Sequence, residues 1–275
     1  MKVLMIDRDR LTAQMLTSQL QEQGHSVEIE PVKNSALERL RSEKFDAVFF
    51  DPSPQSDSRP FVLGLRRALR QGEYPYILLC SHQADADACT KSGANDFLTK
   101  PLDTKLLRHR IDNVARYSEL SSYLSDLEVD YPSKDGVIAK SAIYQLFLAA
   151  IDRADRYGEK TFLLFFTLEN YDEIVAEEGE ENAKATFGTL AKYVKRLRRQ
   201  SDLLGQTNKN EFCLMLMRPV YQSEPVDAAD RYIDTLQSVQ DITSPNGAPV
   251  NIRISLIGLP SAEMIVEQSF TPGNK

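Results

Sequence analysis

Five short apolar segments in the first half of the chain constrain its fold more than any other feature. Each is short enough to be a strand that is buried on both faces, and together they span residues 3–6, 27–29, 47–50, 76–80 and 97–99. Leucines and methionines at helical spacing over 10–23, and a capping residue at Asn34 or Ser35, predict helices between the first strands. Strands that alternate with helices predict an α/β fold with a doubly wound, parallel five-stranded sheet.

Charged residues directly follow three of these segments. Asp7 follows the first, Asp51 the third and Lys100 the last. The carboxyl ends of parallel strands meet at one edge of the sheet, where α/β folds bind their ligands, so we expect these side chains to form one site. A carboxylate nucleophile needs a cation and a metal ion to neutralise an incoming phosphate, and this set of residues suits that chemistry.

Residues 1–118 resemble the response-regulator receiver family, whose fold is flavodoxin-like. Besides the three charged residues, the resemblance rests on Gly93-Ala94 and on Phe97, which precede Lys100 in the chain. Phe97 stands at the aromatic switch position of that family. The resemblance implies that a sensor histidine kinase is a partner of the protein.

The resemblance also implies a role for each charged residue. Asp51 is expected to be the phosphoacceptor, and Lys100 is expected to contact the phosphoryl group. Asp7 is expected to be one of the paired acids that bind Mg²⁺.

Several positions depart from the receiver pattern. The second metal-binding acid is replaced by Arg8, unless Asp9 reaches into the site, and the switch hydroxyl is replaced by Cys80, or is Ser81 if the loop is shifted by one residue. Gln55 stands where a proline is usual. Arg8 would weaken Mg²⁺ binding by repulsion, or would pair with the phosphoacceptor and imitate the phosphorylated state. A pseudo-receiver that serves only dimerisation is the alternative.

A helix that continues beyond the receiver is predicted over residues 104–127. Its apolar residues recur at spacings of three and four, at Leu107, Ile111, Val114, Tyr117, Leu120, Leu124 and Leu127. Residues 119–132 would therefore be a helical linker. Resemblance to receiver–cyclase proteins implies a homodimer through a coiled coil, and a single helix packed on its own receiver is the alternative.

A second domain is predicted over residues 133–262, with a tail at 263–275. Turn-forming residues at 130–136 mark its boundary. The apolar patterns predict strands over 162–166, 212–217 and 250–259, and helices over 181–199 and 226–239. These elements predict an α/β domain with a central mixed sheet.

Residues 195–212 carry the motif that bears most directly on the function of this domain. Arg199 and Asp202 form an Arg-x-x-Asp pair, and after five more residues the chain reads Asn208-Lys209-Asn210-Glu211-Phe212. Together with the order of elements over about 133–260, this register resembles the GGDEF domain of diguanylate cyclases, whose signature is Gly-Gly-Asp/Glu-Glu-Phe.

The residues that the GGDEF family uses for catalysis are replaced. Its two metal-binding acids align with Thr167 and Asn210, and its guanine-contacting residues align with Val175 and Ala176. Both signature glycines, which let the backbone approach phosphate, are also replaced. We therefore predict a protein with no catalytic residues, which is not an enzyme.

The Arg-x-x-Asp pair is kept, and in the family such a pair binds cyclic di-GMP, the product of the enzyme. Arg199 has a planar fork that suits phosphate and the O6/N7 edge of guanine. Asp202, expected one helical turn further on, can accept from guanine N1–H and N2–H₂. Arg231 matches a helper arginine of the family, and Arg198 adds positive charge. The chain is thus predicted to be a cyclic di-GMP receptor that signals through contact with an unidentified downstream protein.

Two other functions stay open. A weakly active cyclase would need Glu169 or Glu211 to hold a metal ion, and a dimeric scaffold with a pseudo-receiver would bind no nucleotide. An Arg-x-x-Asp pair also arises by chance, since basic residues are favoured at the carboxyl end of a helix.

Composition excludes some classes of function. A net charge of −7 and a pI of about 5.2 argue against a nucleic-acid-binding protein. The 3 cysteines are widely spaced and are expected to be buried thiols in a reducing compartment. The sequence contains no run of about 18 apolar residues, so we expect no membrane span and a cytoplasmic location.

Overall fold

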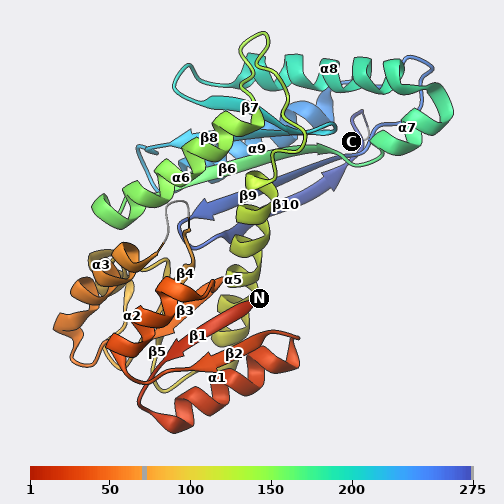
Figure 1. Cartoon of the computed structure of the whole chain (residues 1–275). Coiled ribbons are helices and arrows are strands. Elements are labelled where there is room, and N and C mark those ends of the chain that lie inside the picture. The colour runs from red at the N-terminus through yellow and green to blue at the C-terminus, as the bar shows by residue number, and fades with distance from the viewer. Residues whose placement is uncertain (70–72, 274–275) are drawn as a thin grey trace. The chain divides into compact units, whose positions relative to one another are not determined.

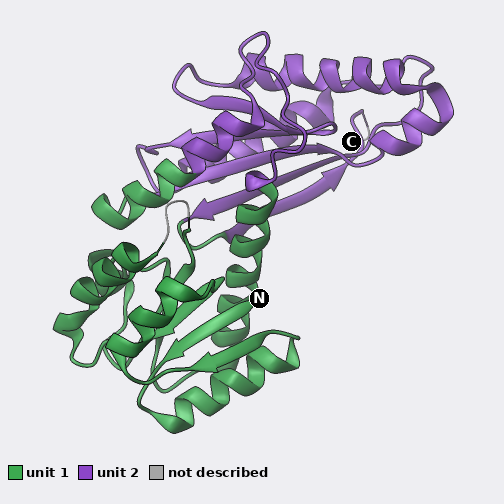
Figure 2. Cartoon of the chain, in the orientation of Figure 1, with its two compact units in different colours: residues 1–123, 148–159, 260–262 green, residues 124–147, 160–259, 263–275 purple. Residues whose placement is uncertain are grey.

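The computed structural model describes residues 1–69 and 73–273, which divide into two compact units (Figure 2). One unit comprises residues 1–123, 148–159 and 260–262, and the other comprises 124–147, 160–259 and 263–275.

The first unit contains a five-stranded parallel sheet whose strand order is β2-β1-β3-β4-β5. Its strands are β1 (Lys2–Ile6), β2 (Ser26–Ile29), β3 (Ala47–Phe50), β4 (Tyr76–Ser81) and β5 (Asp96–Thr99). The helices between and after them are α1 (Arg10–Glu22), α2 (Lys33–Ser42), α3 (Ser58–Ala68), α4 (Ala86–Ser92) and α5 (Thr104–Ser125), and they cover both faces of the sheet (Figure 1). This strand order is that of flavodoxin-like folds, so the predicted fold class of this half is confirmed.

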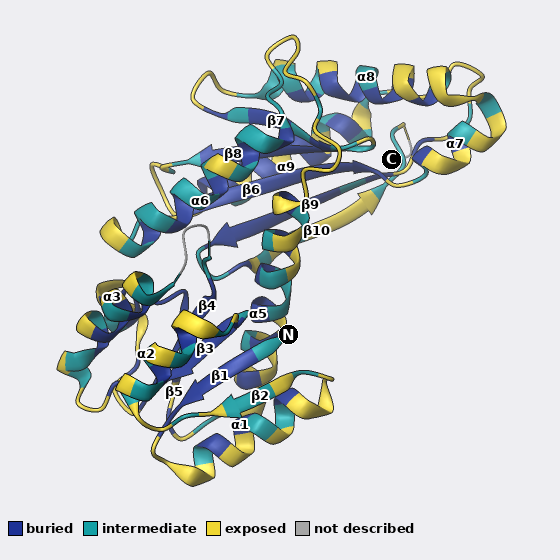
Figure 3. Ribbon diagram, viewed as in Figure 1, coloured by how far each residue is buried: buried dark blue, intermediate teal, exposed yellow. Residues whose placement is uncertain are grey.

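The burial of the strands explains why they could be recognised as apolar runs in the sequence. Every residue of β3 and β4 is buried, as a sheet covered on both faces requires (Figure 3). Helix ends are also set by nearby residues. Asp9 accepts a hydrogen bond from the backbone of Leu11 at the start of α1, and Gly93 ends α4 in the left-handed conformation with φ 80°.

The apolar residues of α5 are buried within the chain. Leu107, Ile111 and Val114 are fully buried, and Leu120 and Leu124 are buried as well. The helix ends at Ser125, two residues before the predicted end at 127, and Leu127 is 42% exposed. These side chains are thus buried in one copy of the chain, and both the coiled-coil homodimer and the single helix packed on its own receiver stay predictions.

The second unit contains a five-stranded sheet with the order β10-β9-β6-β8-β7. Its strands are β6 (Thr161–Leu168), β7 (Leu203–Asn208), β8 (Glu211–Met217), β9 (Ile252–Leu259) and β10 (Glu263–Phe270). Its helices include α7 (Tyr171–Glu178), α8 (Glu180–Leu197) and α9 (Glu224–Ser238), and α6 (Lys140–Tyr157) precedes β6. A mixed sheet was predicted, but its four strand pairings are antiparallel, and the parallel contact is an isolated bridge from Ile138 to Gly205.

The predicted tail at 263–275 is wrong for most of its length, because Glu263–Phe270 forms β10. This strand pairs with β9 at the edge of the sheet, and most of its residues are exposed (Figure 3). Its sequence therefore lacks the continuous apolar run that marks a buried strand.

Aromatic pairs pack the core of the second unit. The rings of Phe187 and Phe212 are stacked with centroids 4.0 Å apart, and those of Phe166 and Tyr232 meet edge to face at 4.8 Å. The cysteines Cys80, Cys89 and Cys213 are buried thiols. Among the described helices, none is long and apolar enough to span a membrane.

Candidate functional site

The structure brings Asp7, Asp51 and Lys100 together at the carboxyl edge of the first sheet. Asp7 follows β1, Asp51 follows β3 and Lys100 follows β5. The Nζ atom of Lys100 lies 2.7 Å from Oδ2 of Asp7 and 2.6 Å from Oδ2 of Asp51. Asp7 and Lys100 are almost fully buried, whereas Asp51 is partly exposed, so a ligand can reach Asp51.

Hydrogen bonds hold Asp51 in its ionised form. Its Oδ1 atom accepts from the backbone amide of Ser53 at 2.9 Å and from the Ser53 hydroxyl at 2.5 Å. Burial raises the pKa of Asp51, but hydrogen bonds from Lys100 and Ser53 outweigh it, and the net pKa lies below the usual value. Burial also opposes the charge of Lys100, yet Asp51 and Asp7 raise the pKa of its ammonium group. The pair is therefore ionic at neutral pH.

The two alternatives for the missing second acid can now be compared. The Asp9 carboxylate caps α1, accepting from Leu11 at 3.1 Å and from the Thr12 hydroxyl at 2.6 Å, so both of its oxygens are engaged at the start of the helix. Arg8 is exposed, and in the described part of the chain no ion pair joins it to Asp51. Of the two effects considered for Arg8, the pair with Asp51 is not formed among the described residues, where Lys100 pairs with Asp51 instead.

Both candidates for the switch position end β4. Cys80 is buried, and burial raises the pKa of its thiol to about 12, with smaller effects of Lys100, Asp7 and Asp51. Ser81 donates from its hydroxyl to the side chain of Gln55 at 3.2 Å. Cys80 lies near the carboxyl end of β4, between the strands that precede Asp51 and Lys100.

In the second unit, Thr167 and Asn210 are engaged with neighbouring protein groups. The Thr167 hydroxyl donates to Glu211 at 2.9 Å, and the Asn210 side chain donates to the backbone carbonyl of Leu168 at 3.0 Å. Thr207 donates to the other Glu211 oxygen at 2.8 Å. These bonds fix the turn between β7 and β8 on the end of β6.

The two acids that a residual cyclase would need are also engaged. Both oxygens of Glu211 accept from threonine hydroxyls, and Glu169 forms an ion pair with Arg253 at 3.6 Å. Over residues 1–69 and 73–273, no group of three or more acidic, histidine or cysteine side chains has the arrangement of a metal site.

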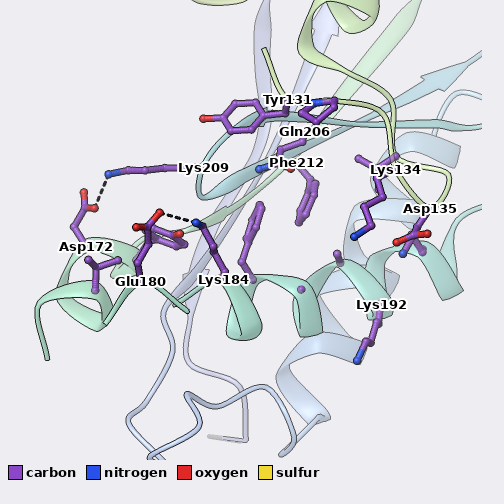
Figure 4. A pocket seen from close by; sticks show the side chains of 18 residues that line it. Tyr131, Lys134, Asp135, Asp172, Glu180, Lys184, Lys192, Gln206, Lys209 and Phe212 are labelled. Atoms are coloured by element: carbon purple, nitrogen blue, oxygen red, sulfur yellow. Dashed lines mark hydrogen bonds and ion pairs between the residues drawn. The ribbon is translucent and has the colours of Figure 1, made fainter. Parts of the chain in front are cut away.

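A cavity of about 740 Å³ opens beside this turn (Figure 4). It lies between residues 131–137, α7, α8 and the β7–β8 turn, and the stacked rings of Phe187 and Phe212 form part of its wall. Sequence reasoning did not find it, because its walls come from segments far apart in the chain.

The lining of the cavity carries more positive than negative charge. Five lysines face three acidic residues among the lining residues. Lys209 pairs with Asp172 at 2.6 Å and Lys184 pairs with Glu180 at 2.7 Å, as Figure 4 shows. Val175, which the sequence analysis aligns with a guanine-contacting residue, also lies in this wall. The arrangement suits an anion, because lysine ammonium groups are donors only and carry positive charge.

Arg199 and Asp202 are predicted from the sequence to lie along a helix. In the structure they lie in a tight turn that follows the helix. The helix α8 ends at Leu197, because Arg198 adopts an extended conformation. The Asp202 carboxylate accepts from the Arg199 amide at 3.3 Å and from the Ser201 hydroxyl at 3.4 Å. Asp202 is buried, and burial raises its pKa, against the opposing effect of Arg199.

The turn gathers the predicted basic residues. Arg199 and Arg231 are exposed, and both act on the pKa of Asp202. Arg231 and Arg198 both oppose the rise of the Tyr232 pKa that burial causes. Arg198 donates to the carbonyl of Gly136 at 3.0 Å, so its side chain holds the start of the domain. The four predicted residues thus share one region of the surface.

Glu224 is a member of this region that the sequence analysis missed. Its carboxylate forms an ion pair with Arg199, although its side chain is only 8% exposed. Glu224 begins α9, where an acidic residue is favoured by the helix dipole, so its sequence position indicated only a helix start.

Comparison with known proteins gives the same two domains. Residues 3–112 match the response regulator receiver domain, and residues 135–263 match the diguanylate cyclase GGDEF domain. The chain is similar to the regulatory protein VanRc of Enterococcus gallinarum, with 25% identity over 64% of this chain and 77% of VanRc. It is also similar to the transcriptional regulatory protein RprY of Bacteroides fragilis, with 28% identity over 42% of this chain and only half, 50%, of RprY.

Among solved structures, the chain is similar to the GGDEF domain of YfiN from Pseudomonas aeruginosa, with 20% identity and a TM-score of 0.37. The similarity covers 43% of this chain and 74% of the YfiN chain. The two domain matches define the class of the protein, which is a response regulator of the two-component signalling type. More particularly, its receiver domain is followed by a GGDEF domain.

Proposed function

We propose that this response regulator is a non-catalytic receptor for cyclic di-GMP, whose output is a contact with another protein. The observation that carries the proposal is the surface region around Asp202, where the exposed guanidinium groups of Arg199 and Arg231 both act on one buried carboxylate. Such a region offers two cationic forks and a fixed acceptor within a protein that is acidic as a whole.

The chemistry of these groups suits the two parts of the ligand. An arginine fork binds phosphate oxygens and the O6/N7 edge of guanine with paired hydrogen bonds. Each carboxylate oxygen can accept more than one hydrogen bond, so Asp202 can hold the turn and still accept from guanine N1–H or N2–H₂. Arg231 adds a second phosphate contact, and Arg198 supports the region from its bond to Gly136.

The GGDEF domain is proposed to be degenerate in its catalytic half. Cyclase chemistry needs acids that bind metal ions bridging the triphosphate. Thr167 and Asn210 are the residues that the sequence analysis aligns with those acids, and both side chains are hydrogen-bonded to protein groups, which supports the proposal. Glu211 accepts from two threonines and Glu169 pairs with Arg253, which supports a structural role for both acids.

The receiver is proposed to accept phosphate on Asp51, with a sensor histidine kinase as the donor. The carboxylates of Asp7 and Asp51 fit Mg²⁺, because this ion keeps several waters and needs only one or two carboxylates from the protein. When bound, Mg²⁺ would supply charge neutralisation for the incoming phosphoryl group. Lys100 already holds both carboxylates and would contact that group.

Several further features of the protein are proposals of the same kind. The protein would act in the cytoplasm as a homodimer and without nucleic acid, and its output partner would be another protein. The acidic net charge of −7 supports the absence of nucleic-acid binding.

Titration calorimetry with cyclic di-GMP tests the receptor function. We expect binding by the wild type and its loss in Arg199→Ala. Arg196→Ala is the matched control, because Arg196 is an exposed arginine in the last turn of α8. Equal losses in both variants would indicate a diffuse basic patch, and undiminished binding in Arg199→Ala would reject the site.

A weakly active cyclase is the second candidate, and the cavity beside the β7–β8 turn favours it. Lysines around this cavity could hold a triphosphate without the missing acids. Incubation with GTP and Mg²⁺ separates the candidates, because the receptor forms no cyclic di-GMP. Turnover that disappears in Glu211→Gln would establish the cyclase. A protein that neither binds nor makes cyclic di-GMP would be the dimeric scaffold.

A further inference from the structure

The Arg199 guanidinium, which the proposed function assigns to cyclic di-GMP, already has an anionic partner in the chain. Glu224 forms an ion pair with it through one carboxylate oxygen. The side chain of Arg199 is 49% exposed, whereas that of Glu224 is 8% exposed. The arginine is thus reachable from solvent on one side and neutralised from the protein on the other.

The second carboxylate oxygen of Glu224 binds the loop between β8 and α9. It accepts a hydrogen bond from the backbone amide of Val220, and the backbone amide of Glu224 donates to the carbonyl of Tyr221 at 3.2 Å. One buried carboxylate therefore links Arg199 to residues 218–223, which connect the strand to the helix. Two side chains of this loop are exposed to solvent: Val220 is 88% exposed and Tyr221 is 53% exposed.

A carboxylate and a phosphate present the same kind of acceptor to a guanidinium fork. Both are anionic, and both accept paired N–H bonds in one plane. Two anions cannot share one fork without repulsion, since like charges at close range destabilise each other. A phosphate of the ligand and the Glu224 carboxylate are therefore competitors for Arg199.

We propose that Glu224 occupies Arg199 in the place of a ligand phosphate, and that cyclic di-GMP displaces Glu224 and thereby releases the 218–223 loop. The proposal rests on the receptor function stated above and adds how binding is regulated and sensed within the domain. Glu224 lowers the affinity for the ligand, and the loop changes with the ligand state of Arg199.

The first test compares Glu224→Gln with the wild type by titration calorimetry with cyclic di-GMP. Glutamine keeps the size of the side chain and removes the charge, so we expect binding that is about tenfold tighter, the factor that one charged hydrogen bond corresponds to. Asp230→Asn is the matched control, because Asp230 is an exposed acid on the same helix. The gain must vanish in the Arg199→Ala/Glu224→Gln double variant.

The second test follows the loop. The chain contains no tryptophan, so Tyr221→Trp places a single tryptophan fluorophore in the 218–223 loop. We expect cyclic di-GMP to shift its emission, and Glu224→Gln to cause a similar shift without ligand. Asp230→Asn must leave the emission unchanged. This measurement does not depend on the folding of a Glu224 variant, because the ligand alone must produce the shift.

The outcomes separate the two proposals. Equal affinity in Glu224→Gln and the wild type, together with lost binding in Arg199→Ala, overturns the competition and leaves the receptor function intact. An emission that stays constant while calorimetry shows binding overturns the release of the loop. If neither the wild type nor Glu224→Gln binds cyclic di-GMP, both the receptor function and the competition are rejected.

Discussion

The ammonium group of Lys100 lies 2.6 Å from a carboxylate oxygen of Asp51. This contact neutralises the expected phosphoacceptor from the protein side, while Asp51 remains partly exposed on the other. Arg8, which the sequence analysis aligns with the second metal-binding acid, is an exposed cation next to Asp7 in the chain. The electrostatics of the receiver therefore depend on two cations with different roles.

Arg8→Asp should strengthen Mg²⁺ binding and speed the phosphorylation of Asp51 by a small phosphodonor. The change removes a repelling cation and adds an oxygen ligand, so we expect about tenfold tighter Mg²⁺ binding, on the scale of one charged contact. Phosphorylation can be followed by mass spectrometry against Mg²⁺ concentration. Arg10→Asp makes the same charge change at an exposed neighbour, and an equal effect there would mean that only net charge matters.

The receiver should lose stability in acid in a manner that depends on Asp51. Burial raises the pKa of Asp51, but Lys100 and Ser53 lower it further, so the folded value lies below the ordinary 3.8. Its stabilising contribution is therefore present above the ordinary pKa and is lost as the pH falls through the lowered value. Thermal melting between about pH 6 and about pH 3 should show a shallower decline in Asp51→Asn. Identical profiles in the two proteins would contradict this assignment.

Binding of cyclic di-GMP should weaken in mild acid because of Asp202. Burial raises the pKa of this carboxyl above the ordinary 3.8, against Arg199, so the acceptor becomes protonated at a higher pH than an exposed aspartate. Affinity should then fall as the pH approaches the raised value from above. Calorimetry from about pH 7 to about pH 4.5 checks it, and Asp202→Asn should bind weakly with little pH dependence. A wild-type affinity that is constant over this range would remove Asp202 from the contact.

Substitutions of the other basic residues should rank by their contact with the ligand. Arg231→Ala should cost about 1.5 kcal/mol of binding free energy, as expected for one charged hydrogen bond. Arg198→Ala should cost less than about 0.5 kcal/mol through a direct effect, because its side chain is bonded to Gly136. Calorimetry on both variants gives the ranking, and the reverse order would exchange the roles of the two arginines.

The receiver fold could be predicted from the sequence because its central strands β3 and β4 are buried on both faces. Continuous apolar runs mark such strands, and the charged residues after them fall at one edge by topology alone. The roles of Arg8 and Asp9 could not be predicted, since a cap at Leu11 and Thr12 competes for the Asp9 carboxylate. That outcome depends on the conformation of the first turn of α1.

The second domain was harder to predict, for physical reasons. The strands β7 and β10 lie at the two edges of their sheet, and polar residues interrupt their apolar patterns. The helix α6 was missed although Ile143, Phe147 and Ile151 are buried at helical spacing, a signal that was present in the sequence. The end of α8 before Arg199 and the partner Glu224 depend on tertiary contacts, which no local pattern records.

The exposed edge of the second sheet has a consequence for the behaviour of the protein at high concentration. An outermost strand carries backbone groups that can recruit a strand from another molecule and so begin aggregation. Glu263 and Glu267 place exposed negative charges along β10. Pairing of two identical β10 edges would bring these negative charges close together. Their repulsion opposes edge-to-edge association of two copies, so the sheet can keep an open edge without promoting aggregation.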